Sequence, residues 1–291
     1  MKVSVIVVTH NRAKQLERCL DSLDKQTERP FEIVVIDDGS TDNTKATVEK
    51  TKGLKYFRQE KKSIAHARNK GLEKAKGDII AFTDDDCIVS NGWVQNIRKA
   101  FERYPQAGAL GGPIACKGDN KYAVAFHLLN FSRSLGSGRV HQEKDMPICN
   151  MAYRKEAIRN TKFQEEGTQH GYEDSLFNYA LKKKGVRLFY IPDISVTHAP
   201  AIESKKEFLR KQRQRGRAFF SVGYKVHGIP GLLLRKFPFL NLLCLRLFLV
   251  SYRCLSDRYY WKRFIRHLPT VFCGEFERGT EILREKIKKL Y

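Results

Sequence analysis

The segment Gly77–Trp93 reads GDIIAFTDDDCIVSNGW and is the most informative part of the chain. Its first half is apolar and β-branched, as in a strand that is buried on both faces. Three carboxylates, those of Asp84, Asp85 and Asp86, follow directly. Neighbouring carboxylates repel one another, and the pKa of at least one rises unless a positive group compensates the repulsion. We therefore expect a positive partner at the end of this strand.

Strand and helix patterns alternate four times in the first hundred residues. The spacing of apolar residues predicts strands at 3–8, 31–40, 54–59 and 78–84. It predicts helices after Asn11, a plausible N-cap, and over about 41–50, 63–77 and 93–104. This alternation is typical of a doubly wound α/β sheet, whose ligands bind at the carboxyl ends of the strands. The polar groups that follow three strands should then meet in one crevice: Thr9–Arg12, Asp37–Asp38 and Asp84–Asp86.

Beyond Trp93 the pattern is less regular. We expect a strand with glycine bends over 107–114, a mixed segment over 117–147, a helix over 171–185 and one or two strands within 186–198. A basic helix over 205–223 follows. We divide the chain into a first domain, 1–204, and a C-terminal extension, 205–291.

The net charge is strongly positive and unevenly spread. The chain has 54 Lys and Arg against 32 Asp and Glu, a formal charge of +22, and residues 201–291 contribute 21 − 7 = +14. Such a field attracts polyanions, whether nucleic acid, an anionic membrane leaflet or phosphorylated substrates. Seven scattered cysteines without a CxxC pair argue against a disulfide framework or zinc site and for a reducing compartment. The N-terminal MKVSVIVVTHNR is expected to be a first strand, not a signal peptide.

The D-x-D pattern of Asp84 and Asp86 suits a metal. In an extended turn these two side chains point the same way and can share a divalent cation, whereas Asp85 is expected to point elsewhere. Carboxylate oxygens suit magnesium or manganese, which commonly bridge a protein carboxylate to substrate phosphates. The alternative is a solvated acidic turn.

Four segments resemble successive blocks of the family 2 glycosyltransferases, which have the GT-A fold: VSVIVVTHNRAKQLERCLDSLDKQT, EIVVIDDGSTDNT, ARNKGLEKAKGDIIAFTDDDC and GYEDSLF. The resemblance covers roughly residues 3–200 in the family's order and spacing. It implies a Rossmann-like nucleotide-sugar-binding domain with a mostly parallel sheet, followed here by a helical extension. It also implies inverting transfer of a sugar from a nucleotide diphosphate donor, UDP-, GDP- or dTDP-linked, with Mn2+ or Mg2+. The acceptor would be a glycan or a lipid-linked (polyprenyl-phosphate) molecule of cell envelope polysaccharide biosynthesis.

The resemblance also implies roles for the strand-end residues. Asp38 is favoured over Asp37 as the contact to the donor's base, although both can instead form an acidic turn that caps the next helix. Arg68 is expected near the base or phosphates, or else in an ion pair with a strand-end aspartate. The donor-binding set is then Thr9, Asn11, Arg12, Asp37, Asp38, Arg68, Asp84, Asp85, Glu173 and Arg215.

Two further roles concern the general base and the metal. Asp174 in GYEDSLF would be the general base, although Glu173 and Asp174 can equally cap the helix that they open. His198 would join Asp84 and Asp86 as a metal ligand, or be structural only.

Two weaker motifs concern the acceptor side. QRQRG (212–216) resembles the family's Q-x-x-R-W block with Gly216 in place of Trp. This departure separates the chain from processive polysaccharide synthases, and leaves Arg215 to contact a diphosphate or acceptor phosphate unless the helix is simply a solvated basic one. NMAYR (150–154) is placed at an acceptor-side loop, where Asn150 can touch either sugar.

The tail suggests a membrane surface. Residues 237–250 are apolar but shorter than the roughly 20 residues that a spanning helix needs. Basic and aromatic residues flank them, so we expect peripheral contact through 228–266, at the inner face of the membrane of a cytoplasmic protein. The alternative is a helical core with a basic exterior.

Two other classes of function are considered. A nucleic-acid-binding protein is less consistent with the sequence because the basic excess is concentrated in the tail and no nucleic-acid motif is recognised. A nucleotidyltransferase normally has a glycine-rich phosphate loop after the first strand, which THNRAKQ lacks.

Overall fold

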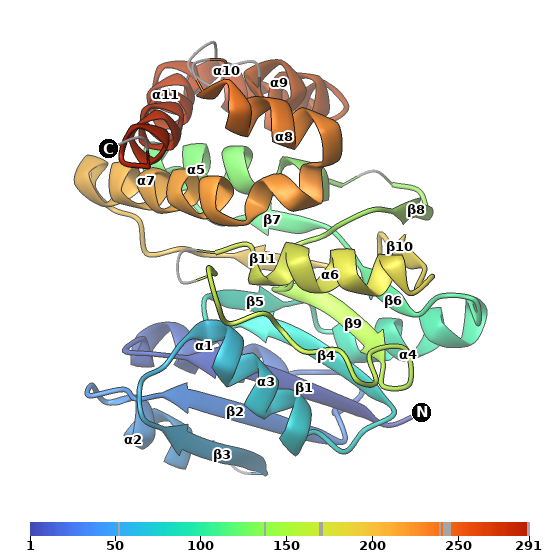
Figure 1. Ribbon diagram of the computed structural model, residues 1–291. Helices are drawn as coiled ribbons and strands as arrows, with labels where there is room; N and C mark the ends of the chain where they lie inside the picture. Colours follow the sequence, from blue (N-terminus) through green and yellow to red (C-terminus); the bar gives the residue numbers. More distant parts are fainter. Residues whose placement is uncertain (52, 137, 169–170, 239, 241–245, 290–291) are drawn as a thin grey trace. The chain divides into compact units, whose positions relative to one another are not determined.

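The computed structural model describes residues 1–51, 53–136, 138–168, 171–238, 240 and 246–289 (Figure 1). The chain forms two compact units. The first comprises Met1–Ala115, Gly136–Glu165 and Phe177–Ala199, and the second comprises Cys116–Leu135, Glu166–Leu176 and Pro200–Tyr291. The second unit thus includes two segments that precede residue 205. The division into 1–204 and 205–291 stays a prediction about the sequence.

The first unit is built on an eight-stranded sheet of order β3-β2-β1-β4-β9-β6-β10-β8. Its parallel part follows the apolar runs of the sequence: β1 (Val3–Thr9), β2 (Glu32–Asp38), β3 (Leu54–Gln59) and β4 (Ile79–Asp84). β9 (Asn150–Arg154) is antiparallel to both β4 and β6 (Ala109–Gly111). β10 (Leu188–Tyr190) runs parallel to β6, and β8 (His141–Glu143) is antiparallel to β10.

A three-stranded sheet of order β5-β11-β7 begins directly after the acidic cluster. It comprises β5 (Cys87–Val89), β11 (Val196–His198) and β7 (Ile114–Cys116). β5 and β11 are antiparallel, with His198 opposite Cys87. This pairing brings His198 to the residue that follows Asp86.

The helices of the first unit each bury one face. They are α1 (Ala13–Asp24), α2 (Thr44–Glu49), α3 (Ile64–Lys74), α4 (Trp93–Arg103) and most of α6 (Glu173–Lys183). The buried face is strongly apolar in α1 and α4. α3 lies against β1 and β2 (Figure 1). It approaches closely because Gly71 has no side chain, and a Cβ there would lie 2.6 Å from Ile6 Cγ2.

The predicted N-cap of α1 is wrong. The helix begins at Ala13, and the residue at the cap position is Arg12. Asn11 has a left-handed backbone, with φ of 52°, and its Oδ1 accepts a hydrogen bond from Thr41 N at 2.7 Å. Asn11 therefore joins the loop after β1 to the loop after β2, and does not cap the helix.

The second unit is helical where the structure describes it. Its elements are α5 (Lys121–Phe131), the 3-10 turns Ser132–Ser134 and Gly223–His227, α7 (Lys205–Ser221), α8 (Gly228–Lys236), α9 (Arg246–Leu255), α10 (Arg258–Arg266) and α11 (Leu268–Ile287). Of the apolar segment 237–250, residues 239 and 241–245 lie outside the described residues. Within the described part of the chain, no helix is long and apolar enough to cross a membrane.

Close packing of two helices explains why Gly216 stands where the family's Q-x-x-R-W block has Trp. α7 packs on α11 so closely that a Cβ at Gly216 would lie 2.7 Å from the Arg278 carbonyl oxygen and 3.0 Å from Glu281 Cβ. The first contact is with backbone and cannot move aside cheaply. A tryptophan at this position does not fit the helix pair.

A buried carboxylate ties together the amino-terminal edge of the parallel strands. Glu32 Oε1 accepts hydrogen bonds from Ser4 Oγ at 2.6 Å and from Lys76 N at 2.5 Å. Its Oε2 accepts one from Lys55 Nζ at 2.6 Å. Burial raises the pKa of Glu32, but the hydrogen bonds from Lys55, Ser4 and Lys76 outweigh it and hold this pKa below its ordinary value.

We predict that Glu32→Gln lowers the free energy of unfolding by about 1–2 kcal/mol at pH 7, because charge-assisted hydrogen bonds are lost. The figure is modest because Lys55 is 43% exposed. The folded-state pKa lies below the unfolded one, so this stabilisation is present above about pH 4.3 and is lost as the pH falls through the folded value. Urea denaturation at pH 7 and at pH 3.5 measures the difference in unfolding free energy between wild type and Glu32→Gln. This difference should be smaller at pH 3.5.

Glu49→Gln is the matched control. The Glu49 carboxylate lies 3.8 Å from Lys45 Nζ with both side chains more than 60% exposed. Glu49→Gln should change the free energy of unfolding by less than about 0.5 kcal/mol at either pH. Equal effects of the two substitutions at pH 7 would contradict the role given to Glu32.

Candidate active site

Two arginines compensate the three carboxylates that follow β4. Arg12 Nη1 donates to Asp85 Oδ1 at 2.9 Å and to Asp86 Oδ2 at 3.0 Å. Arg68 Nη2 donates to Asp84 Oδ1 at 3.2 Å. Asp85, Asp86 and Arg68 are buried, whereas the Asp84 side chain is 33% exposed. The expectation of a positive partner at this strand end is confirmed.

Asp85 does not point away from Asp86, contrary to the expectation from the D-x-D pattern. Both accept from the same nitrogen of Arg12, and Asp85 Oδ2 also accepts from Thr9 Oγ1 at 2.8 Å. Burial raises the pKa of Asp85 to about 7; Arg12 opposes this rise and Asp86 adds to it. The Asp85 carboxylate in turn raises the pKa of Arg12, which stays charged.

Asp84 shares this environment. Loss of bulk water raises the pKa of its carboxyl, Arg68 lowers it, and Asp86 raises it further. Arg68 is thus held in the ion pair that the sequence allowed as one of its two roles.

His198 lies beside the cluster. Its Nε2 is 3.4 Å from Asp86 Oδ1, and both side chains are buried. A carboxylate and an imidazole this close can act on one cation. Within the described residues, however, no group of three or more His, Cys, Asp or Glu side chains is arranged to hold a metal ion. The metal role of Asp84, Asp86 and His198 stays a prediction.

Asp37 and Asp38 differ in how their oxygens are used. Asp37 Oδ1 accepts from Ser40 N at 2.8 Å and its Oδ2 accepts from Tyr56 OH at 2.5 Å. Asp37 is only 1% exposed, so it holds the turn after β2. Asp38 Oδ1 accepts from Gln59 Nε2 at 2.7 Å and from Lys62 N at 2.9 Å.

The strand register gathers these side chains at one edge of the sheet. Thr9 pairs with Asp37, and Val8 pairs with Asp84. Asp38 pairs with Gln59 at the end of β3. Sequence reasoning missed Gln59 and Tyr56, although the available signal was that β3 is a fourth parallel strand with polar residues at its end.

The remaining predicted residues belong to the second unit. Glu173 and Asp174 form the first turn of α6; Glu173 is buried, and Asp174 Oδ1 accepts from Ser175 N at 2.8 Å. Arg215 of α7 lies near the turn that leads into α6, since a Cβ at Gly171 would lie 3.4 Å from Arg215 Nη1. The three residues are therefore near one another in sequence or space within that unit.

Asn150 is a structural residue of β9, and the predicted acceptor-side loop at NMAYR is wrong. Its Oδ1 accepts from Trp93 Nε1 at 2.8 Å. Its Nδ2 donates to the carbonyl oxygens of Ile194 at 2.8 Å and Pro113 at 3.1 Å. Asn150 has no exposed surface, so it joins three segments of the first unit in its core.

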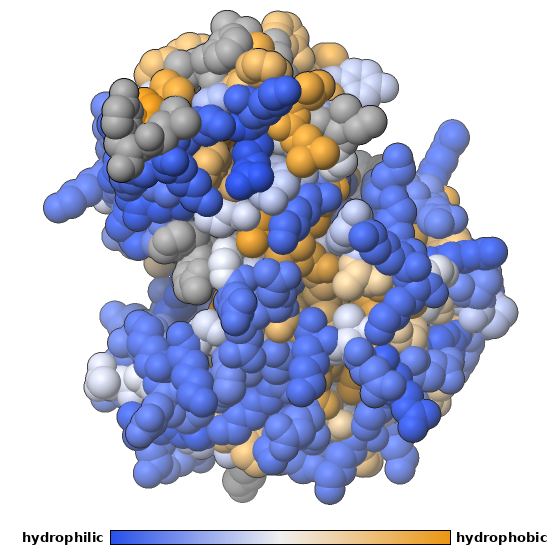
Figure 2. All heavy atoms as spheres, viewed as in Figure 1, coloured by the Kyte–Doolittle hydropathy of each residue, from blue (hydrophilic) through white to orange (hydrophobic). Residues whose placement is uncertain are grey.

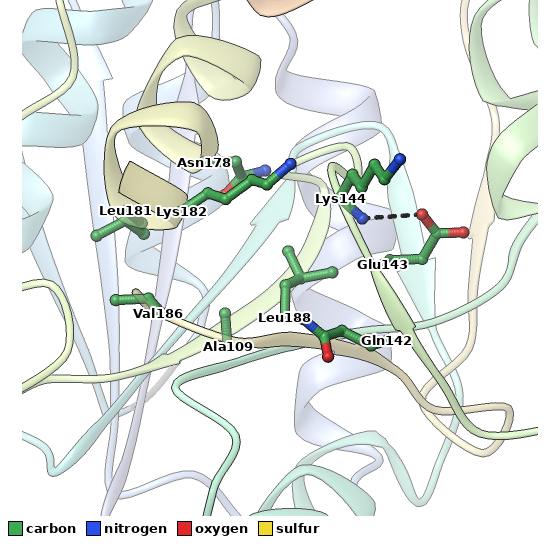
Figure 3. A pocket seen from close by; sticks show the side chains of 9 residues that line it. All are labelled: Ala109, Gln142, Glu143, Lys144, Asn178, Leu181, Lys182, Val186 and Leu188. Carbon is green, nitrogen blue, oxygen red and sulfur yellow. Dashed lines mark hydrogen bonds between the residues drawn. The ribbon is translucent and has the colours of Figure 1, made fainter. Parts of the chain in front are cut away.

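A cavity of about 210 Å³ lies apart from this cluster (Figure 3). Side chains of β8, β10 and α6 line it, among them Glu143, Leu188, Asn178 and Lys182. Lys144 N donates to Glu143 Oε2 at 3.0 Å at its rim. The residues predicted to bind donor or metal are not among those that line this cavity.

The α/β architecture with a large, mostly parallel sheet is that of the GT-A fold. Solved structures agree. The mannosyltransferase PcManGT from Pyrobaculum calidifontis, in complex with GDP-Man and Mn2+, matches with a TM-score of 0.58 and 18% identity over 98% of this chain and 88% of that one. S. aureus TarS 1-349 matches with a TM-score of 0.57 and 19% identity over 98% and 92%. The predicted fold class is confirmed.

The chain belongs to Glycosyl transferase family 2, whose sequence profile matches residues 4–162. This match covers more than half of the chain and confirms the predicted family and the predicted class of enzyme.

Curated relatives have related names. The GalNAc(5)-diNAcBac-PP-undecaprenol beta-1,3-glucosyltransferase of Campylobacter jejuni is 30% identical over 204 residues, 65% of this chain and 62% of that protein. The O-antigen chain rhamnosyltransferase RfbN of Salmonella typhimurium is 26% identical over 220 residues, 72% and 70% of the two chains. In the first three relatives, the match spans 19%, 38% and 62% of the relative's own length.

We predict that Asn150→Ala lowers the free energy of unfolding by about 2–4 kcal/mol, because it leaves one N–H group and two carbonyl groups without their partner in the core. Binding of a nucleotide-sugar to the folded protein should stay within about twofold of wild type. Chemical denaturation and calorimetric titration measure the two quantities. Asn96→Ala is the control, since Asn96 Nδ2 bonds the Asp193 carbonyl oxygen in an exposed position. Unchanged stability with weakened binding would restore a role for Asn150 at the sugar.

Proposed function

We propose that the protein transfers a sugar, with inversion, from a nucleotide-diphospho-sugar to a hydroxyl or phosphate of a glycan or lipid-linked acceptor. The observation that carries this proposal is the edge of the sheet where Arg12 joins Asp85 to Asp86, with His198 at 3.4 Å from Asp86. The printed names of two relatives, one acting on an undecaprenol-linked substrate and one on an O-antigen chain, support such an acceptor in cell envelope polysaccharide synthesis. Family membership favours sugar transfer over nucleotidyl transfer or nucleic-acid binding.

The donor's base would lie against Asp38, and Thr9, Asn11 and Arg12 would line the same edge. Asp38 is the better candidate than Asp37 because the contacts of Asp38 within the described residues use Oδ1, whereas both oxygens of Asp37 are engaged. Arg12 and Arg68, both held in place by ion pairs, would supply positive charge to the donor's diphosphate. UDP-, GDP- and dTDP-linked donors are the candidates.

A divalent ion, Mn2+ or Mg2+, would be held by Asp86 and His198 with Asp84. By ligand type, two carboxylates and an imidazole suit such an ion, since Mn2+ accepts both oxygen and nitrogen ligands. The three side chains would have to move closer together to hold it, because the described residues are not arranged as a metal site. When bound, the ion would neutralise charge that develops on the diphosphate leaving group. Arg12 and Arg68 contribute to the same neutralisation from the protein.

Asp174 is proposed as the general base. The acceptor oxygen would form a bond to the anomeric carbon as the bond from that carbon to the diphosphate oxygen breaks. Asp174 would take the proton of the acceptor hydroxyl. Glu173 would assist at the donor, and Arg215 would contact a diphosphate or acceptor phosphate. We also propose a cytoplasmic protein positioned at the inner face of the membrane, where lipid-linked acceptors are found.

The first prediction concerns the donor and the metal. In a thermal-shift screen, one class of nucleotide-sugar should raise the melting temperature more strongly with Mn2+ than without it. A ligand at a hundredfold excess over its Kd raises the free energy of unfolding by about 2.7 kcal/mol. Asp86→Asn should remove the Mn2+-dependent part of the shift. Asp193→Asn, which changes an exposed carboxylate, should leave it intact. Equal donor affinity with and without Mn2+ in wild type would count against the metal role.

The second prediction concerns the base. Asp174→Asn should keep donor affinity within about threefold but lower the rate of sugar transfer by about 10²–10⁴-fold, because general-base catalysis is lost. Calorimetric titration and a single-turnover assay with a glycan acceptor separate binding from transfer. Near-normal turnover would remove Asp174 from this role without affecting the assignment of the donor edge.

A further inference from the structure

Helix α9 exposes an apolar stripe that the proposed chemistry does not use. Phe248, Tyr252 and Leu255 are 71%, 74% and 57% exposed and recur at i, i+4 and i+7, so they share one face. The opposite face buries Val250 and Cys254 completely. Figure 2 shows apolar side chains gathered over the C-terminal helices, beside strongly hydrophilic ones. The helix therefore packs by one apolar face and presents a second apolar stripe to its surroundings.

Helix α10 follows directly and exposes positive charge. Arg258, Lys262 and Arg266 are exposed, with Ile265 at 50% exposure between them, whereas Tyr260 and Phe264 are buried. Residues 246–266 contain one acidic residue, Asp257, whose side chain accepts from Tyr259 N and caps α10. The charge that this part of the chain presents is thus basic.

Helix α11 has an exposed apolar stripe of its own. Leu268, Phe272 and Phe276 recur every four residues and are 39%, 50% and 44% exposed, and the rings of Phe272 and Phe276 stack with centroids 6.3 Å apart. The acidic residues of this helix pair with basic side chains of the same unit: Glu275 with Arg246 and Arg278, Glu277 with Arg213, Glu281 with Arg217 and Arg284, and Glu285 with Lys288. These pairs therefore do not involve the exposed cations of α10.

We propose that these helices bind the surface of an anionic phospholipid bilayer. The lipid face is defined by Phe248, Tyr252, Leu255, Phe272 and Phe276, with the cations Arg258, Lys262 and Arg266. The proposal rests on the proposed function, since a lipid-linked acceptor is presented at such a surface. Phenyl and tyrosyl rings insert at the boundary between headgroups and acyl chains, to a depth of about 5–10 Å, while the basic side chains meet lipid phosphates. The proposed lipid face differs from the expected segment 228–266 because it includes the start of α11.

Charge argues for a membrane over a second copy of this chain. A twofold dimer through this face would bring Arg258, Lys262 and Arg266 of one copy against the same face of the other. Like charges facing one another across an interface oppose association. An anionic leaflet complements both the cations and the rings. Since α9 and α10 have 10 and 9 residues, they are suited to lie in the plane of the interface rather than to cross it.

The test uses the full chain and vesicles of 30 mol% phosphatidylglycerol in phosphatidylcholine, compared with pure phosphatidylcholine. The chain has two tryptophans, and Trp93 is fully buried in the first unit, so a change in emission on vesicle addition reports on Trp261 of α10. We expect co-sedimentation with the anionic vesicles, a blue shift of the Trp261 emission, and binding that weakens with salt.

Two triple variants separate the contributions. Phe248→Ser, Tyr252→Ser, Leu255→Ser should weaken binding to anionic vesicles at least tenfold. Arg258→Gln, Lys262→Gln, Arg266→Gln should weaken it similarly and flatten its salt dependence. The matched control is Phe31→Ser, Ile64→Ser, which changes side chains that are 48% and 41% exposed in the first unit. Its binding should equal that of wild type.

Three results would overturn the proposal: no binding to anionic vesicles, binding that neither triple variant reduces, or a concentration-dependent dimer that the apolar triple variant abolishes. The melting temperature of each variant, and its thermal shift with nucleotide-sugar, are also measured without vesicles. These measurements distinguish failure of the lipid face from failure of the proposed function. Donor binding without vesicle binding defeats the lipid face alone. Vesicle binding without donor binding defeats the transferase assignment and supports the lipid face.

Discussion

Neutralisation of the three carboxylates after β4 is the constraint on which the first unit depends. Arg12 reaches Asp85 and Asp86 from the start of α1, and Arg68 reaches Asp84 from α3. Buried carboxylates without such partners would be strongly destabilising in their charged form. Both helices must therefore be packed on the sheet before its carboxyl edge can hold its charge. The same interactions that stabilise the fold also orient the groups proposed to bind a diphosphate.

The second unit uses charge in its interior. Arg246 and Arg278 both pair with the buried Glu275, and Glu281 joins α11 to α7 through Arg217. The Glu281–Arg217 pair depends on how closely α7 and α11 approach at Gly216. The acidic side chains of α11 pair with arginines and a lysine of the same unit. They therefore leave the exposed cations of α10 without an acidic partner among the described residues of α11. The same ion pairs thus join the helices and leave the surface positively charged.

Local patterns in the sequence predicted β1 to β4 to within two residues and the convergence of their polar ends, because burial on both faces leaves an apolar run and parallel strands end at one edge. Features that depend on distant segments were not predictable. Asn11 resembles an N-cap, but its partner Thr41 lies in another loop. The second oxygen of Asp37 is engaged by Tyr56 from β3. β9 has only five residues, and its pairing with β4 is set by tertiary contacts, not by any local period.

The position of β9 has a consequence for the order of assembly. β4 is flanked by β1 on one side and by β9 on the other, yet β9 begins 66 positions after β4 ends, at Asn150. The ribosome has therefore synthesised the four parallel strands well before it synthesises β9, the strand that pairs with the open edge of β4. During that interval the nascent chain carries an unpaired, highly apolar β4 border, which is the kind of edge that invites non-native pairing. Translation rate and chaperone access thus bear on this protein through a single short strand.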